Sequence, residues 1–343
     1  MKLKAMQFMV IMIYNLSYMP EHPLDCYQSL VISILDYYGF SALESLGSVW
    51  PWLFHISEVK SGVPVVHNKY LTNNERLLRL FGCSMTVRKI DSENIQSTLL
   101  EELSKNPFIL NIDQYFVPHH YSHIFMQKHG EHTLLVKGVC DDQSQYYCLD
   151  VRPKYDGMIP ADMLIHGIQY YNHMGGSRIS TLNILHNVRL THDEVFEMFV
   201  NEVKLVIHLI ESRPITHDKN SLLDVVMIIK SYYEEMSFEE YLLTLRELCS
   251  LPWFWELERI YAWTLYYLNA EYPRKRLGIY HAQFILDLRS ICSEAKSLFK
   301  KLYKSTLVRN KSYCDDVFAQ LDYLCDMEYN VIKRLLHILS VRY

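Results

Sequence analysis

A chain of 343 residues is long enough to form two domains, each with a hydrophobic core. Its formal net charge of −5 excludes the broad basic surface that holds nucleic-acid phosphates, so we expect no nucleic-acid partner. We also expect no membrane association, because no stretch approaches the roughly 20 apolar residues of a membrane span. Eight cysteines are scattered without a compact disulfide framework, which favours reduced thiols and a cytoplasmic location.

The first residues partly imitate a signal peptide, because a basic start is followed by the apolar run Met9–Tyr14. Gln7 interrupts the apolar stretch, and no small-residue cleavage site follows. We therefore expect a strand that leads into the next loop rather than a targeting segment.

A nucleophile candidate, Cys26, opens the first amphipathic helix. Asp25 is a natural N-cap, apolar residues recur at helical spacing from Leu30 to Tyr38, and Gly39 supplies the stop. The partial positive charge of a helix N-terminus stabilises a thiolate, and its unpaired N–H groups can stabilise an oxyanion. This position therefore suits nucleophilic catalysis.

The partners of this thiol are expected on a β-hairpin. Thr133–Val139 and Tyr146–Val151 are β-branched and apolar runs separated by polar turn residues. His132 enters the first strand and Asp150 leaves the second, so both lie toward one end of the hairpin. A carboxylate there can hold an imidazole in the orientation that a general base requires.

These segments resemble the papain-like superfamily, and more closely the family of butirosin biosynthesis protein H, over roughly residues 14 to 155. The segments that carry the resemblance are Asp25–Ser29, Asn111–Pro118, Glu131–Val136 and Tyr147–Asp150. The resemblance implies an α+β papain-like catalytic domain that moves an acyl group from a carrier-protein thioester to an amine of a small natural product. It implies Cys26 as nucleophile, His132 as base and Asp150 as the residue that orients the base, with no cofactor.

Several roles stay open. Asp113, Gln28 and Tyr115 are candidates for contacts with substrate, although Asp113 is equally suited to capping a loop. Asp156 is the alternative orienting carboxylate if Asp150 faces away. The glutamine that papain-like enzymes place shortly before the nucleophile has no counterpart, because Pro20 stands there.

Five histidines lie close together before and at the start of the hairpin, which raises the possibility of a metal site: His119, His120, His123, His129 and His132. The segment lacks a His-Glu-x-x-His or Cys-x-x-Cys pattern, and Pro118 indicates a loop. We therefore expect a solvated loop that lines the cleft, and no metal.

Beyond residue 190 the pattern is helical almost throughout, with capping-box starts at Thr191–Glu194 and Ser237–Glu240. We expect a papain-like domain over residues 1–189 and an all-α domain over 190–343. Aromatic residues from Trp253 to Tyr267 are typical of core packing and could also line an acyl pocket. The basic run Arg274–Arg276 is either a solvated face or a docking site for an acidic carrier protein.

The sequence therefore favours a cysteine acyltransferase of natural-product biosynthesis. A cysteine peptidase or amidase is the alternative within the same chemistry, since the triad does not specify whether water or an amine is the second nucleophile. A non-catalytic binding protein that uses its helical half as an interaction surface is the alternative from another class.

Overall fold

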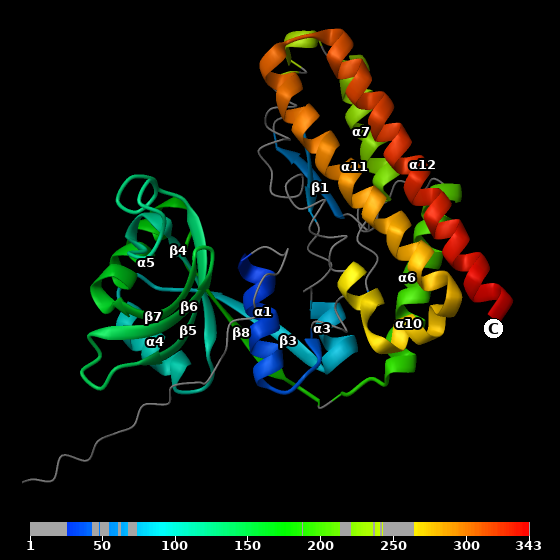
Figure 1. The fold of residues 1–343 in the computed structure, drawn as a ribbon. Coiled ribbons are helices and arrows are strands. Elements are labelled where there is room, and N and C mark those ends of the chain that lie inside the picture. Colours follow the sequence, from blue (N-terminus) through cyan, green and yellow to red (C-terminus); the bar gives the residue numbers. More distant parts are fainter. Residues whose placement is uncertain are drawn as a thin grey trace, which may run out of the picture. The chain divides into compact units, whose positions relative to one another are not determined.

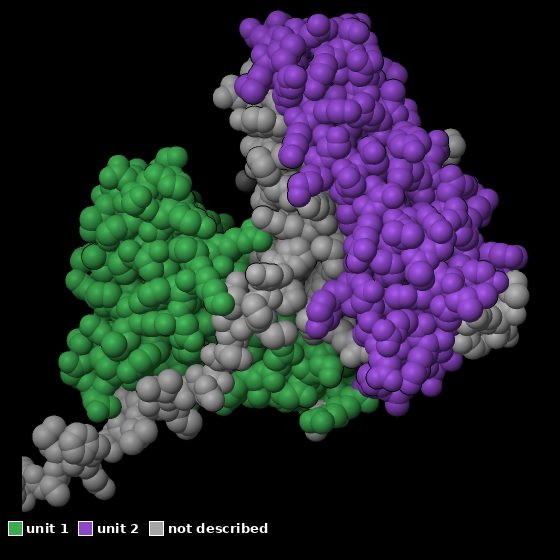
Figure 2. All heavy atoms as spheres, in the orientation of Figure 1, with its two compact units in different colours: residues 1–21, 25–42, 74–189 green, residues 22–24, 43–73, 190–343 purple. Residues whose placement is uncertain are grey.

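The computed structural model describes residues 26–42, 48, 55–60, 63–67, 74–186, 188–212, 221–235, 237–240, 242 and 264–342. The chain divides into two compact units, which Figure 2 shows in different colours. Unit 1 comprises residues 1–21, 25–42 and 74–189, and unit 2 comprises residues 22–24, 43–73 and 190–343. The architecture is mixed α+β, as the sequence predicts.

Unit 1 is built on a six-stranded antiparallel sheet with the strand order β3-β8-β4-β5-β6-β7 (Figure 1). The strands are β3 (Cys83–Lys89), β4 (Phe108–Asp113), β5 (Glu131–Val139), β6 (Gln145–Val151), β7 (Lys154–Pro160) and β8 (Arg178–Ile184). The helical elements are α1 (Cys26–Tyr37), α3 (Asn74–Phe81), α4 (Ile95–Leu103), the short 3-10 helix η2 (Gln114–Phe116) and α5 (Ala161–Met174).

The central strand β5 is covered on both faces. Every residue from His132 to Val139 is buried, although alternate side chains of a strand point to opposite faces. A strand that is buried at every position requires packing on both faces. α1 packs against β4, β5 and β6, and α5 packs against β4 and β7. In Figure 1, α1 lies on the side of these strands away from α5.

Helix α1 is buried along most of its length, from Gln28 to Leu35. It ends as the sequence predicts, because Gly39 adopts a φ of +79°, a left-handed conformation that favours glycine. The packing of α1 against the middle of the sheet fixes the direction of its N-terminal turn, where Cys26 lies.

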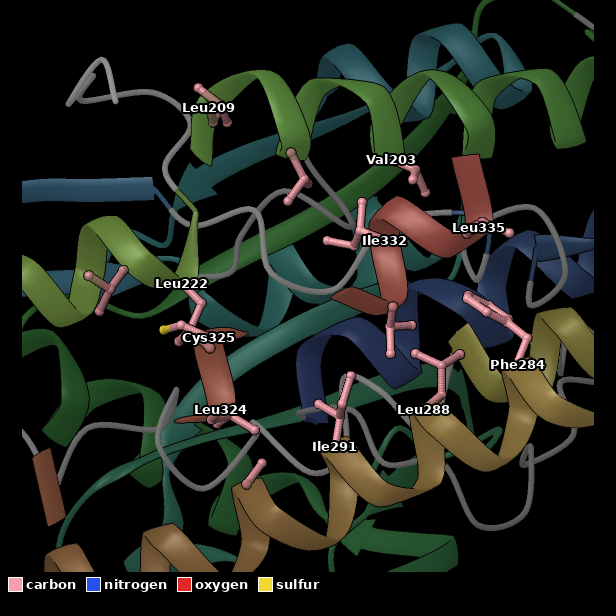
Figure 3. Packing of buried hydrophobic residues seen from close by; sticks show 14 of the residues in the cluster. Val203, Leu209, Leu222, Phe284, Leu288, Ile291, Leu324, Cys325, Ile332 and Leu335 are labelled. Carbon is pink, nitrogen blue, oxygen red and sulfur yellow. The ribbon is translucent and has the colours of Figure 1, made fainter. Parts of the chain in front are cut away.

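Unit 2 contains α6 (His192–Ser212), α7 (Leu222–Glu235), α10 (Glu271–Leu277), the 3-10 helix η3 (Gly278–Tyr280), α11 (His281–Val308) and α12 (Lys311–Arg342). The two longest helices run side by side, and α12 also packs against α6 and α7 (Figure 1). Figure 3 shows their apolar side chains meeting in one buried cluster, which includes Val203, Leu222, Ile291 and Ile332.

Both predicted capping boxes are present. The Glu194 carboxylate accepts from the Thr191 N–H at 2.7 Å, while the Thr191 hydroxyl accepts from the Glu194 N–H at 3.3 Å. Ser237 and Glu240 form the same reciprocal pair. Each box satisfies N–H groups that the first helical turn leaves without a partner.

The predicted division of the chain needs a correction. One boundary between the units does fall at residues 189 and 190, but residues 43–73 belong to unit 2. This segment contributes the antiparallel pair β1 (His55–Lys60) and β2 (Val63–His67), so unit 2 is not all-α. Unit 1 is therefore discontinuous in sequence, a feature that the hydrophobic pattern along the chain does not reveal.

Some predicted features lie outside the described residues, namely the strand near Met9–Tyr14, the Asp25 cap and the Trp253–Trp255 cluster. Among the described helices, none combines the length and the apolar character needed to span a bilayer.

Candidate active site

The nucleophile candidate lies at the start of α1. Cys26 is the first residue of this helix and is half-buried. α1 packs against β5 and β6, the two strands that carry His132 and Asp150. The helix that begins at Cys26 therefore packs on the two strands that carry the histidine and the carboxylate, within unit 1.

His132 and Asp150 form a buried pair. Val136 of β5 pairs with Cys148 of β6, so His132 and Asp150, each an even number of residues away from these positions, share that face of the sheet. The His132 Nε2 lies 2.6 Å from the Asp150 Oδ2. Asp150 has no exposed surface and the His132 side chain is only 7% exposed, so water does not compete for this contact.

The same carboxylate oxygen holds a second histidine. The His119 Nε2 lies 2.7 Å from the Asp150 Oδ2, and its ring stacks on the Tyr155 ring with a centroid distance of 3.8 Å. The other oxygen of Asp150 accepts from the Arg152 N–H at 3.0 Å. The sequence pointed to a crowd of histidines, but only the fold shows that His119 meets Asp150.

These contacts set the charge of the site. Burial raises the pKa of the Asp150 carboxyl, but the hydrogen bonds from His119 and His132, with that of the Arg152 N–H, outweigh burial and lower the pKa below its ordinary value. Asp150 is therefore an ionised acceptor at neutral pH. Because His132 donates from Nε2, its Nδ1 is the nitrogen that can take a proton from a nucleophile.

A third histidine, His120, borders the pair. Its ring lies edge-to-face with His132 at a centroid distance of 4.8 Å, and its Nδ1 accepts from the Tyr121 N–H at 2.9 Å. Burial, and then the positive charge that His132 can carry, lowers the pKa of His120 to about 4. His120 is therefore a neutral imidazole at neutral pH.

The remaining histidines of the segment point elsewhere. His123 is exposed and stacks on Tyr121, while the His129 Nδ1 contacts the Asp113 Oδ2 at 2.7 Å. No cluster of three His, Cys, Asp or Glu side chains with the geometry of a metal site occurs in the described part of the chain.

Asp113 closes a loop. It is fully buried, and its Oδ1 accepts from the N–H groups of Tyr115 and Gly130 at 3.0 Å each. Its Oδ2 holds His129, whose ring stacks between those of Tyr115 and Tyr170 at 4.4 and 4.0 Å. Asp113 thus joins both ends of the segment 114–130, which carries His119 and His120. This geometry matches the loop-capping role rather than direct contact with substrate.

The other predicted site residues differ in accessibility. Gln28 is buried within α1, whereas Tyr115 is partly exposed beside His129. Asp156, the alternative orienting carboxylate, pairs with the Lys137 Nζ at 2.6 Å.

No protein-family model matches the chain. Nor does any curated protein sequence match it.

Proposed function

We propose that this chain is a thiol-dependent acyltransferase whose catalytic residues, Cys26, His132 and Asp150, lie in a papain-like unit 1. The observation that carries the proposal is the buried 2.6 Å contact between His132 and Asp150, on strands packed against the helix that begins at Cys26. A histidine oriented by an ionised carboxylate can serve as the base for a cysteine nucleophile, and a helix N-terminus stabilises the thiolate that results.

In the acylation half-reaction, the His132 Nδ1 takes the proton of the Cys26 thiol. The thiolate attacks the carbonyl carbon of a thioester, and the negative charge moves to the carbonyl oxygen. When this tetrahedral intermediate collapses, the bond to the carrier thiol breaks, and His132 returns its proton to the departing sulfur. The acyl group is then a thioester of Cys26.

In the transfer half-reaction, an amine attacks the same carbonyl carbon. His132 takes a proton from the attacking nitrogen, the bond to the Cys26 sulfur breaks, and the product leaves as an amide. Asp150 holds the imidazole in place in both halves and stabilises its charged form.

The oxyanion needs donors. The backbone N–H groups of the first turn of α1, which begins at Cys26, point toward the N-terminal end of the helix. They are the donors we assign to this task, because Pro20 replaces the glutamine of papain-like enzymes.

The proposed donor substrate is an acyl thioester on a carrier protein, and the proposed acceptor is an amine of a small natural product. The basic run Arg274–Arg276 is only weak support for a carrier-protein partner. Lys275 pairs with Glu271 at 2.6 Å, and Arg276 pairs with Asp193 at 3.3 Å. Two of its three cations are thus engaged within unit 2.

Two other functions predict different results. A cysteine peptidase or amidase would use the same residues with water in place of the amine. A non-catalytic binding protein would keep the His132–Asp150 contact for structural reasons alone.

Brief alkylation at neutral pH tests the nucleophile. Cys26 should react far faster than the buried thiols, because burial raises the pKa of Cys83 to about 11 and raises those of Cys148 and Cys325 further from neutrality. Peptide mapping identifies the labelled cysteine. Preferential labelling of another cysteine, with Cys26 inert, would refute the assignment.

Intact-mass spectrometry with an acyl-pantetheine thioester separates the three functions. The transferase should accumulate one acyl adduct that is absent in Cys26→Ala and disappears as amide when an amine is added. Amine-independent hydrolysis with peptide cleavage would indicate a peptidase. No adduct from any thioester would favour the binding protein.

A further inference from the structure

The orienting carboxylate is shared by two imidazoles. The Nε2 atoms of His119 and His132 lie 2.7 and 2.6 Å from the same oxygen of Asp150. The His119 side chain is only 8% exposed, and Asp150 is fully buried. A triad needs one histidine on its carboxylate, so the second imidazole requires an explanation.

The contacts of His119 define it as a fixed donor. Its Nε2 must carry a proton to donate to the ionised Asp150. Its Nδ1 is buried and has no hydrogen-bond partner among the described residues. A bare lone pair at Nδ1 is cheaper to bury than an N–H group without an acceptor. Tyr155 holds the plane of the ring, since the two rings are tilted by only 2°.

This placement also excludes His119 as the general base. A base must present a free nitrogen to the nucleophile or to a water-filled cleft. The only nitrogen of His119 that Asp150 does not occupy is sealed from solvent. His119 therefore acts on the site through Asp150.

We propose that His119 is a positioning residue that shares the Asp150 carboxylate with His132 and thereby limits how strongly Asp150 retains the proton of that imidazole. The proposal rests on the assignment of Cys26, His132 and Asp150 made above. Each donor to a carboxylate stabilises its anion and makes it a weaker acceptor for the next donor. His119 also fixes Oδ2 in direction, because two donors restrict rotation of the carboxylate more than one does.

The test is an NMR titration of the imidazoles in the full-length chain. The protein carries ¹⁵N-labelled histidine, and Cys26→Ala removes the thiol so that only the imidazoles exchange protons in this region. The signals of His132 are assigned by their loss in His132→Gln. In His119→Leu we expect His132 to keep its proton to a pH about one unit higher than in the parent.

Three controls make the result specific. His119→Gln retains an N–H donor and should restore most of the parent titration. His123→Leu alters the same loop at an exposed position and should have no effect. A second, uniformly ¹⁵N-labelled sample shows whether His119→Leu disturbs the packing on Tyr155, because the amide signals along β7 would then shift. In that case His119→Met, which keeps more of the bulk over the Tyr155 ring, is used as the apolar variant instead of His119→Leu.

An unchanged titration of His132 in the apolar variants, or equal shifts in His119→Gln and His119→Leu, would overturn the proposal. The proposed function is tested separately, by alkylation of Cys26 in the otherwise unaltered chain. Failure of one proposal can therefore be told apart from failure of the other.

Discussion

Removal of the Asp113 side chain should open the segment 114–130. In Asp113→Ala, the N–H groups of Tyr115 and Gly130 and the imidazole of His129 lose their common acceptor. Hydrogen bonds to a charged group contribute about 1.5 to 3 kcal/mol each. Part of this gain is offset by the cost of burying the carboxylate, so the expected net loss is about 3 to 5 kcal/mol, as for other broken buried pairs.

Native-state hydrogen exchange measures this loss locally, which matters because two units need not unfold together. Two reporter N–H groups belong to the segment but do not donate to the Asp113 side chain. The Gln114 N–H donates to the Gly130 carbonyl at 2.8 Å, and the Met126 N–H donates to the Tyr115 carbonyl at 3.0 Å. A loss of 3 kcal/mol corresponds to exchange at least about a hundredfold faster, up to complete loss of protection.

The matched control is Asp91→Ala. The Asp91 Oδ1 also accepts from a backbone N–H two residues ahead, that of Glu93 at 3.2 Å, but this contact is exposed. Its loss should cost less than about 0.5 kcal/mol, and only locally. If the Gln114 and Met126 amides stay protected in Asp113→Ala, Asp113 does not hold the segment closed.

Two further predictions concern His120 and the carboxylates. The ordinary pKa of histidine is 6.5, whereas that of His120 in the folded protein is lowered to about 4. Between these two pH values the unfolded chain binds more protons than the folded protein, so the free energy of unfolding falls as the pH falls. His120→Gln should flatten this pH dependence in urea denaturation, and the exposed His123→Gln should not; equal slopes in all three proteins would contradict it. Asp150→Asn should slow acyl-enzyme formation by about two to four orders of magnitude in single-turnover mass spectrometry. Asp156→Asn should leave the rate close to that of the parent, and the reverse ranking would show that the wrong carboxylate has been chosen.

The central hairpin was predictable because its signal is local. β5 is one apolar and β-branched run, and its neighbour β6 follows a polar turn. The outer strands β3 and β7 carry no comparable signal, because an edge strand has one neighbour fewer and buries fewer side chains. The pair β1 and β2 was missed as well, and with it the discontinuous course of unit 1.

The role of His119 could not be predicted from the sequence, for a different reason. Five histidines within fourteen positions looked alike in sequence, and a loop has no periodicity that fixes where its side chains point. The fold separates them by closing the segment 114–130 on Asp113, which brings His119 onto Asp150 and leaves His123 exposed. This distinction depends on contacts between distant parts of the chain.

The choice between Asp150 and Asp156 depends on strand parity. Leu149 of β6 pairs with Asp156 of β7, so Asp156 shares the face of Leu149, which is opposite to that of Asp150. An extra residue in β5, Lys137, interrupts the register with β6, and its ammonium meets Asp156. A slip of one residue would exchange the faces of the two carboxylates. The contact between His132 and Asp150, rather than the order of residues along the chain, is therefore the reason for assigning the orienting role to Asp150.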